Sequence, residues 1–103
     1  MAQWVKLCEA HESPKPGEVI EATTSGLTIC LANVDGHLCA LDNVCPHRGG
    51  PLGEGWLEGQ AVVCPWHSWA FNTTTGITRP PEKSKVSVFP VKIEGEDVLV
   101  QLS

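Results

Sequence analysis

The sequence predicts an all-β protein, and three observations support this fold class. Short runs rich in β-branched and apolar residues recur along the chain, for example "LTICLANV" at 27–34. Turn signals separate these runs, and the clearest is Asp35-Gly36, because both residue types accept the positive φ angles of a tight hairpin turn. No stretch has an apolar pattern of helical period. The chain has 103 residues, so we expect residues 1–103 to form a single domain with a modest core.

The expected strands follow one another with short connections. The Asp35-Gly36 turn joins 27–34 to 37–43 ("HLCALDN") as a hairpin, and "EGED" joins 85–93 ("KVSVFPVKI") to 98–102 ("VLVQL") as a second hairpin. The other expected strands share the same apolar character; they are 4–8 ("WVKLC"), 18–22 ("EVIEA"), 60–66 ("QAVVCPW") and 69–72 ("WAFN").

The central stretch, residues 43–69, differs from the rest of the chain. It contains three prolines and five glycines, a density that a regular sheet does not accept. We therefore expect loops held on a β scaffold, with a loop-rich subdomain at approximately 43–72. Gly49, Gly50 and Gly53 either shape turns or let backbone N–H groups come close to a sulfur atom.

Charge and hydropathy exclude several classes of function. The formal net charge is −5 and the acidic residues are spread along the chain, so neither nucleic acid nor a membrane surface is an expected partner. The chain contains no apolar run of transmembrane length, and its first residues lack the features of a signal peptide. We expect a soluble, cytoplasmic protein.

The five cysteines fall into two groups. Cys8, Cys30 and Cys39 lie within apolar runs, where a thiol behaves as a small hydrophobic group. Cys45 and Cys64 each lie close to a histidine in a loop that contains proline. A disulfide framework is not expected, which fits a reducing compartment.

Two loops supply a possible set of four metal ligands. The pattern is Cys45-x-His47, sixteen residues, and then Cys64-x2-His67. Two thiolates and two imidazoles suit zinc, or a [2Fe–2S] cluster with two cysteines on one iron and two histidines on the other. The single residue between Cys45 and His47 is shorter than the usual spacing in zinc sites. A third reading is that these residues only shape their loops.

The segments "CPHRGGPLGEG" (45–55) and "CPWHSWAFNTTTG" (64–76) resemble the Rieske [2Fe–2S] proteins. The resemblance extends to the Pro80-Pro81 stretch and to "VFPVKIEGEDVLV" (88–100). It implies a β-sandwich base that carries a smaller cluster-binding subdomain. It also implies one [2Fe–2S] cluster, with Cys45 and Cys64 on the inner iron and His47 and His67 on the outer iron.

The chain departs from the high-potential members of that family, which serve respiratory and photosynthetic complexes. Those proteins have an additional disulfide, whereas the matching positions here hold Gly50 and Trp66. They also have Ser and Tyr hydroxyls that donate hydrogen bonds to sulfur, whereas the matching positions hold Trp69 and Phe71. Fewer donors to sulfur disfavour the reduced cluster, so we expect a potential near the lower end of the Rieske range, about −150 mV.

These features favour a one-electron carrier and not an enzyme. We expect it to accept electrons from a flavin-dependent reductase and pass them to an oxygenase or a similar terminal redox protein. The alternatives are a small subunit of an assimilatory nitrite reductase and a zinc-stabilised binding module without redox activity. His11 and His37 are expected at the surface, so no further histidine pair remains for an oxygenase iron site. We expect Trp66 to pack against the cluster, with a docking role as the alternative.

Overall fold

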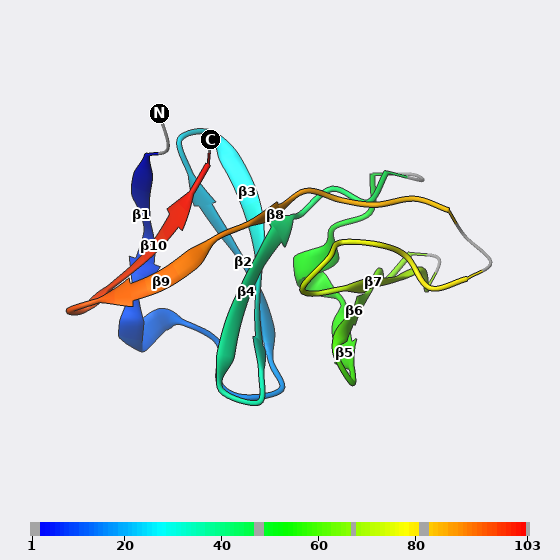
Figure 1. Ribbon diagram of the computed structural model, residues 1–103, viewed down its shortest axis with the longest axis horizontal. Coiled ribbons are helices and arrows are strands. Elements are labelled where there is room, and N and C mark those ends of the chain that lie inside the picture. The colour runs from blue at the N-terminus through cyan, green and yellow to red at the C-terminus, as the bar shows by residue number, and fades with distance from the viewer. Residues whose placement is uncertain (1–2, 47–48, 67, 81–82, 103) are drawn as a thin grey trace.

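The computed structural model describes residues 3–46, 49–66, 68–80 and 83–102. Within these ranges the chain folds into three antiparallel sheets, which confirms the all-β class (Figure 1). The first sheet has the order β1-β10-β9, the second β2-β3-β4-β8, and the third β5-β6-β7. The strands are β1 (Trp4–Glu9), β2 (Val19–Thr24), β3 (Leu27–Val34), β4 (His37–Asp42), β5 (Trp56–Glu58), β6 (Ala61–Val63), β7 (Ala70–Asn72), β8 (Val88–Phe89), β9 (Val91–Glu94) and β10 (Asp97–Gln101).

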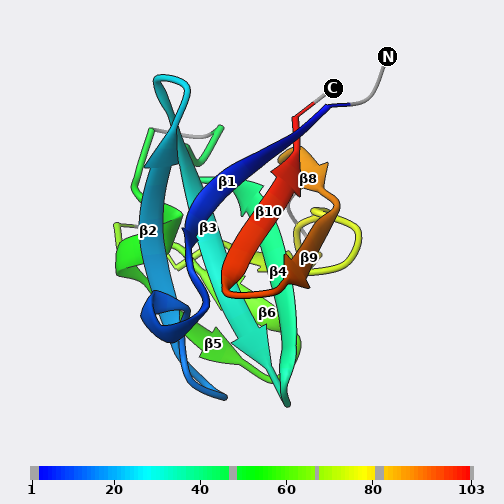
Figure 2. The same cartoon turned by 90° about the vertical axis from the view of Figure 1, so that its left-hand side faces the viewer.

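The second sheet is the middle layer of the molecule. Figure 1 shows the β1-β10-β9 sheet on one side of it and the small β5-β6-β7 sheet with its loops on the other, and Figure 2 shows the same order from the side of β1. One buried cluster joins the first sheet to the middle sheet. A second buried cluster joins the middle sheet to the small sheet and its loops.

Strand β3 explains how one sheet can serve both clusters. Successive side chains of a strand point to opposite faces. Ile29 and Leu31 are fully buried against the first sheet, and Cys30 between them is fully buried in the cluster on the side of the small sheet. The nearly continuous apolar sequence of 27–34 is therefore the pattern of a strand covered on both faces.

Both expected hairpins are confirmed. The β3–β4 turn has φ angles of 53° at Asp35 and 93° at Gly36, so both central residues adopt the left-handed conformation of a primed turn. The β9–β10 hairpin pairs Glu94 with Asp97, and Gly95 has φ 64°.

Two expectations about strands were wrong. Residues 56–58 were expected to lie in a loop, but they form β5 and pair with β6 through a turn in which Gly59 has φ 63°. Residues 85–93 were expected to form one strand, but Pro90 separates β8, which pairs with β4, from β9, which pairs with β10. Proline cannot donate to a ladder, so it suits the point where the chain leaves one sheet for another.

Helical structure in the described ranges is limited to two short 3-10 turns, η1 (Ala10–Glu12) and η2 (Leu52–Glu54). In the same ranges we find no helix with the length and apolar character needed to cross a membrane.

Candidate metal centre

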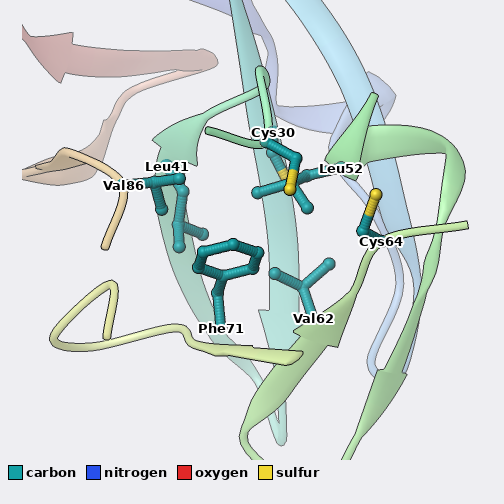
Figure 3. Close-up of a cluster of buried hydrophobic side chains, with 8 residues drawn as sticks. Cys30, Leu41, Leu52, Val62, Cys64, Phe71 and Val86 are labelled. Carbon is teal, nitrogen blue, oxygen red and sulfur yellow. The ribbon is translucent and has the colours of Figure 1, made fainter. Parts of the chain in front are cut away.

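The two cysteines of the expected ligand set lie in one buried cluster. Cys45 and Cys64 are both 0% exposed and belong to the cluster between the middle sheet and the small sheet. Figure 3 shows Cys64, Phe71 and Val62 entering this cluster from the side of the small sheet, and Cys30 from the middle sheet. His47 and His67 lie outside the described residues. Of the four expected ligands, the structure therefore places the two cysteines.

Each cysteine begins a six-residue loop, and the two loops have the same backbone hydrogen bonds. We call residues 45–50 loop 1 and residues 64–69 loop 2. In each loop the fifth residue donates its N–H to the carbonyl oxygen of the cysteine, at 2.8 Å in loop 1 and 2.9 Å in loop 2. The cysteine N–H donates to the carbonyl oxygen of the sixth residue, at 2.9 Å and 2.8 Å. The fifth and sixth residues are Gly49 and Gly50 in loop 1, and Ser68 and Trp69 in loop 2.

The fifth residue of each loop also has the same unusual conformation. Gly49 has φ 74° and Ser68 has φ 62°. A residue other than glycine seldom adopts a positive φ, so its presence in loop 2 indicates a backbone shape imposed by the rest of the loop. The described residues of "CPHRGG" and "CPWHSW" therefore share backbone hydrogen bonds and a positive φ as well as a similar sequence.

Gly50 brings the two loops into contact. A Cβ atom at this position would lie 2.6 Å from Sγ of Cys64 and 3.2 Å from Cγ of Trp66. The absence of a side chain thus lets the Gly50 backbone lie close to the Cys64 sulfur.

The residues present fit a sulfur-ligated metal group. Two buried thiols extend from matching positions of two touching loops, and a glycine leaves room beside one sulfur. Thiolate is the ligand that both zinc and iron–sulfur clusters prefer. Within the described ranges no three His, Cys, Asp or Glu side chains gather to hold a metal ion. The two histidine positions, which complete the expected set, are outside those ranges.

Cys30 is a third buried cysteine in the same cluster. Burial, with smaller contributions from Glu21 and Cys39, raises the pKa of its thiol to about 12. It therefore remains a neutral thiol at pH 7 and packs as a small apolar group, as its position in the sequence predicts.

Trp66 packs only in part. Its ring lies next to Gly50, but its side chain is 62% exposed, and Val44 beside loop 1 is 54% exposed. The expected packing of Trp66 against the cluster stays a prediction, and the exposure of its ring also suits the alternative docking role. Trp66 of loop 2 thus presents an apolar ring to solvent two residues from the buried Cys64.

The Arg79 side chain ties the start of the proline stretch to the small sheet. Its guanidinium donates to the Glu58 carbonyl oxygen at 2.9 Å and to Oε1 of Glu58 at 3.3 Å. The Trp56 indole N–H donates to Oε2 of the same carboxylate at 2.9 Å. These hydrogen bonds, first that of Trp56 and then that of Arg79, lower the pKa of Glu58. Arg79, which directly precedes Pro80, is thus held against Glu58 at the end of β5.

Sequence reasoning overlooked Asn43, which adjoins loop 1. This side chain is 5% exposed and links β2 to η2 through hydrogen bonds described below. A single asparagine before a cysteine gives no signal of such a role, because its partner on β2 lies 22 residues away in sequence. His11 and His37 are exposed, as expected.

Comparison with protein families gives a match over most of the chain. The profile of the Rieske [2Fe-2S] domain matches residues 3–90. The chain is 34% identical over 102 residues to the ferredoxin component of a naphthalene 1,2-dioxygenase system from Pseudomonas aeruginosa, covering 98% of this chain and 97% of the relative. It is 36% identical over 102 residues to the biphenyl dioxygenase ferredoxin subunit of Pseudomonas sp. (strain KKS102), covering 97% and 93%.

Solved structures give the same fold. A ferredoxin from Sphingomonas yanoikuyae B1 superposes with a TM-score of 0.86 at 27% identity, covering 98% of this chain and 100% of that one. A ferredoxin in a complex of reduced oxygenase and oxidized ferredoxin of carbazole 1,9a-dioxygenase superposes with a TM-score of 0.83 at 30% identity, covering 95% and 92%. The small subunit of an NADH-dependent nitrite reductase from Mycobacterium tuberculosis has a TM-score of 0.87 at 21% identity, covering 100% and 97%, which shows a shared fold alone.

Proposed function

The chain belongs to the Rieske [2Fe–2S] family, and from that membership we propose that it is a free-standing electron carrier that serves an oxygenase. Its cofactor is a Rieske-type [2Fe–2S] cluster. It is an electron-transfer component and not itself a catalytic enzyme, because its relatives are ferredoxin components of dioxygenase systems. The observation that carries the proposal is that these relatives match this chain over nearly their whole length.

We propose Cys45, His47, Cys64 and His67 as the ligands of the cluster. The burial of both cysteines and the matching hydrogen bonds of loops 1 and 2 support this assignment. We further propose that 43–72 forms the cluster-binding subdomain of one domain spanning residues 1–103.

When bound, the cluster supplies a centre that accepts and releases one electron. The chain's own contribution is to hold two sulfur ligands in fixed positions and to keep water from them. Phe71, Leu41 and Leu52 are each 0% exposed and surround the two cysteines in one apolar cluster. A dry, rigid shell keeps reorganisation during electron transfer small.

The same shell supports a low reduction potential. Phe71, at the position where high-potential relatives have a tyrosine, is fully buried among apolar residues and has no hydroxyl group to donate. Without such donors the added negative charge is stabilised less well, and we propose a potential near the lower end of the Rieske range, about −150 mV.

A flavin-dependent reductase is the electron donor that suits such a potential, and a terminal oxygenase is the acceptor. A ferredoxin similar to this chain is known in a complex with the oxygenase of carbazole 1,9a-dioxygenase. We place the contact surface at loops 1 and 2, because Trp66 of loop 2 and Val44, directly before loop 1, are exposed and electrons transfer over short distances. A cytoplasmic location is also proposed, since Cys8, Cys30 and Cys39 form no disulfide.

The carrier role is preferred to the two alternatives. A nitrite reductase small subunit shares the fold, but its 21% identity is lower than that of the dioxygenase ferredoxins. Co-purification with a large sirohaem-flavin subunit would instead favour that role. A zinc module disagrees with the family match.

The test is an absorption and low-temperature electron paramagnetic resonance (EPR) study of the protein before and after reduction with dithionite. We expect a red-brown protein whose reduced form gives the signal of a [2Fe–2S] cluster with nitrogen ligands. Cys45→Ser and His67→Ala should each remove that signal. A colourless protein with one zinc per chain and no signal would refute the proposal.

A further inference from the structure

Asn43 links loop 1 to two other parts of the fold. It follows β4, lies two residues before Cys45, and is buried. Its side-chain N–H donates to Oε2 of Glu21 on β2 at 2.6 Å, and its side-chain oxygen accepts from the N–H of Gly53 in η2 at 2.7 Å. Its backbone carbonyl accepts from the N–H of Leu52 at 2.8 Å.

The chemistry of the partners fixes the orientation of the Asn43 amide. A backbone N–H can only donate and a carboxylate can only accept, so the amide oxygen must face Gly53 and the amide nitrogen must face Glu21. Rotating the amide by 180° would place its nitrogen against the Gly53 N–H and its oxygen against the Glu21 carboxylate. Removing one partner of a buried amide in such a position lowers the free energy of unfolding by about 1–3 kcal/mol.

Gly53 shows how closely these parts approach. A Cβ atom there would lie 2.4 Å from Cγ of Glu21, 2.7 Å from Oδ1 of Asn43 and 3.0 Å from the carbonyl oxygen of Ile20. Strand β2 and η2 are thus in direct contact at the point where Asn43 joins them. No side chain fits between them without moving one of the two.

The hydrogen bonds of Asn43 continue directly into those of loop 1. Cys45 and Gly50 are joined by a hydrogen bond of 2.9 Å, and Val44 pairs with Pro51 in an isolated bridge. The Asn43 contacts with Leu52 and Gly53 are the next step along the same two segments. The stem of loop 1 is therefore closed from Cys45 down to β2. Since Gly50 contacts Cys64, the position of this stem also sets the separation of the two loops.

We propose that Asn43, oriented by Glu21, is the positioning residue that fixes loop 1 and its ligand Cys45 on the middle sheet. The proposal rests on the proposed function, because it assumes that Cys45 holds the cluster. Both residues act through the backbone of loop 1.

The test uses three variants of the cluster-loaded protein. Asn43→Asp places a second carboxylate against Glu21, so it opposes the contact while preserving the shape of the side chain. Asn43→Asp with Glu21→Gln restores a donor and an acceptor in the reverse direction. The glutamine amide of this double variant can donate to the new carboxylate, which still accepts from Gly53. Glu18→Gln is the control for the Glu21→Gln change: it also replaces a glutamate by glutamine, but at an exposed residue whose carboxylate accepts from the Lys15 N–H.

Three measurements distinguish positioning from a general loss of stability. They are the rate of cluster loss in the presence of a chelator, the EPR spectrum of the reduced protein, and hydrogen–deuterium exchange of the peptide covering 51–55. We expect cluster loss about tenfold faster in Asn43→Asp, with a changed EPR spectrum and faster exchange at 51–55. The double variant should return all three toward the wild-type values, and Glu18→Gln should leave them unchanged.

The proposal is overturned if Asn43→Asp behaves like Glu18→Gln, or if the double variant shows no recovery. If Asn43→Asp does not fold, the double variant still decides: a folded protein with normal cluster retention supports the proposal, and a failure to hold the cluster refutes it. A wild-type protein without a [2Fe–2S] signal would refute the proposed function instead, and this result is seen before any variant is compared.

Discussion

Gly50 is the residue whose small size matters most for the site. Its backbone lies where a side chain would meet the sulfur of Cys64, and its φ angle is not in the left-handed region. Gly49 beside it has space for a side chain but a left-handed backbone: no atom lies within 4 Å of the position that a Cβ would take, and its φ is 74°. Adjacent glycines are therefore required for different reasons, one by space and one by conformation.

This difference predicts distinct effects for two alanine substitutions. Gly49→Ala should lower the free energy of unfolding by about 1–2 kcal/mol, because alanine is strained at positive φ, while the protein keeps its iron. Gly50→Ala should reduce the iron content per chain, because its Cβ competes for the space beside Cys64. Iron and protein assays combined with thermal unfolding measure both quantities. Equal iron contents in the two variants would contradict the role of Gly50.

Phe71 offers a test of the low potential. Phe71→Tyr places a hydroxyl in the cluster of residues around Cys45 and Cys64, where it can donate to sulfur. One such hydrogen bond should raise the potential by about 60 mV, equivalent to about 1.4 kcal/mol for one electron. Redox titration followed by EPR measures the shift. Phe89→Tyr is the control, because Phe89 packs in the cluster on the other side of the middle sheet. A potential unchanged in both variants would argue against the missing hydroxyl as the cause.

At the scale of elements, the small sheet depends on contacts between its strands and the segment that follows. Arg79 donates its backbone N–H to the carbonyl of Ala70 on β7 at 2.9 Å, while its side chain contacts Glu58 at the end of β5. Arg79 thus joins the exit of β7 to β5 through both the backbone carbonyl oxygen and the carboxylate of Glu58.

The lowered pKa of Glu58 predicts a pH dependence of stability. Because the folded protein favours the ionised carboxylate, its contribution is complete above the ordinary value of 4.5 and is lost as the pH falls through the lowered pKa. Unfolding temperatures of the wild-type and Glu58→Gln proteins should differ most near pH 7 and converge below pH 4.5. The difference should be small, since the pair is exposed. Glu54→Gln, at another exposed carboxylate, serves as control. A difference that grows on acidification would contradict the assignment.

Several elements were predictable from sequence because their signals are local. The bounds of β3 and the Asp35-Gly36 hairpin follow from an apolar run and a turn dipeptide. Strand β5 was missed because it has three residues between Gly55 and Gly59, and the division at Pro90 was missed because the apolar pattern continues across it. Cys45 and Cys64, the proposed ligands, could be selected from their spacing to His47 and His67, but the contact of Asn43 with Glu21 depends on the fold and leaves no pattern in the sequence.

At the scale of the whole molecule, the layers separate two tasks. The first sheet and the middle sheet form a base with its own apolar cluster, and the small sheet with its loops lies on the other side of the middle sheet (Figure 1). Trp66 of loop 2 and Val44, which precedes loop 1, are exposed. A partner can therefore contact the loops without disturbing the base.

This separation predicts that Trp66→Ala slows electron transfer to an oxygenase and spares the cluster. We expect the rate to a terminal oxygenase of the naphthalene dioxygenase type to fall about tenfold, as is common when an interface tryptophan is truncated. The rate to ferricyanide and the reduction potential should stay unchanged. Ile93→Ala, which truncates a residue on β9 that is 55% exposed, is the matched control. Stopped-flow absorbance measures both rates, and equal losses in the two variants would remove Trp66 from the contact surface.

The repeated hydrogen bonds of loops 1 and 2 also bear on how sequences with this fold can vary. Each loop is a closed ring in which the first residue bonds to the fifth and to the sixth, so adding or deleting one residue would break both bonds at once. The connection from Pro51 to Val63 includes the β5–β6 hairpin, whose turn can lengthen without altering either ring. Insertions and deletions accumulated over evolution should therefore fall between the two Cys/His motifs and avoid their interiors.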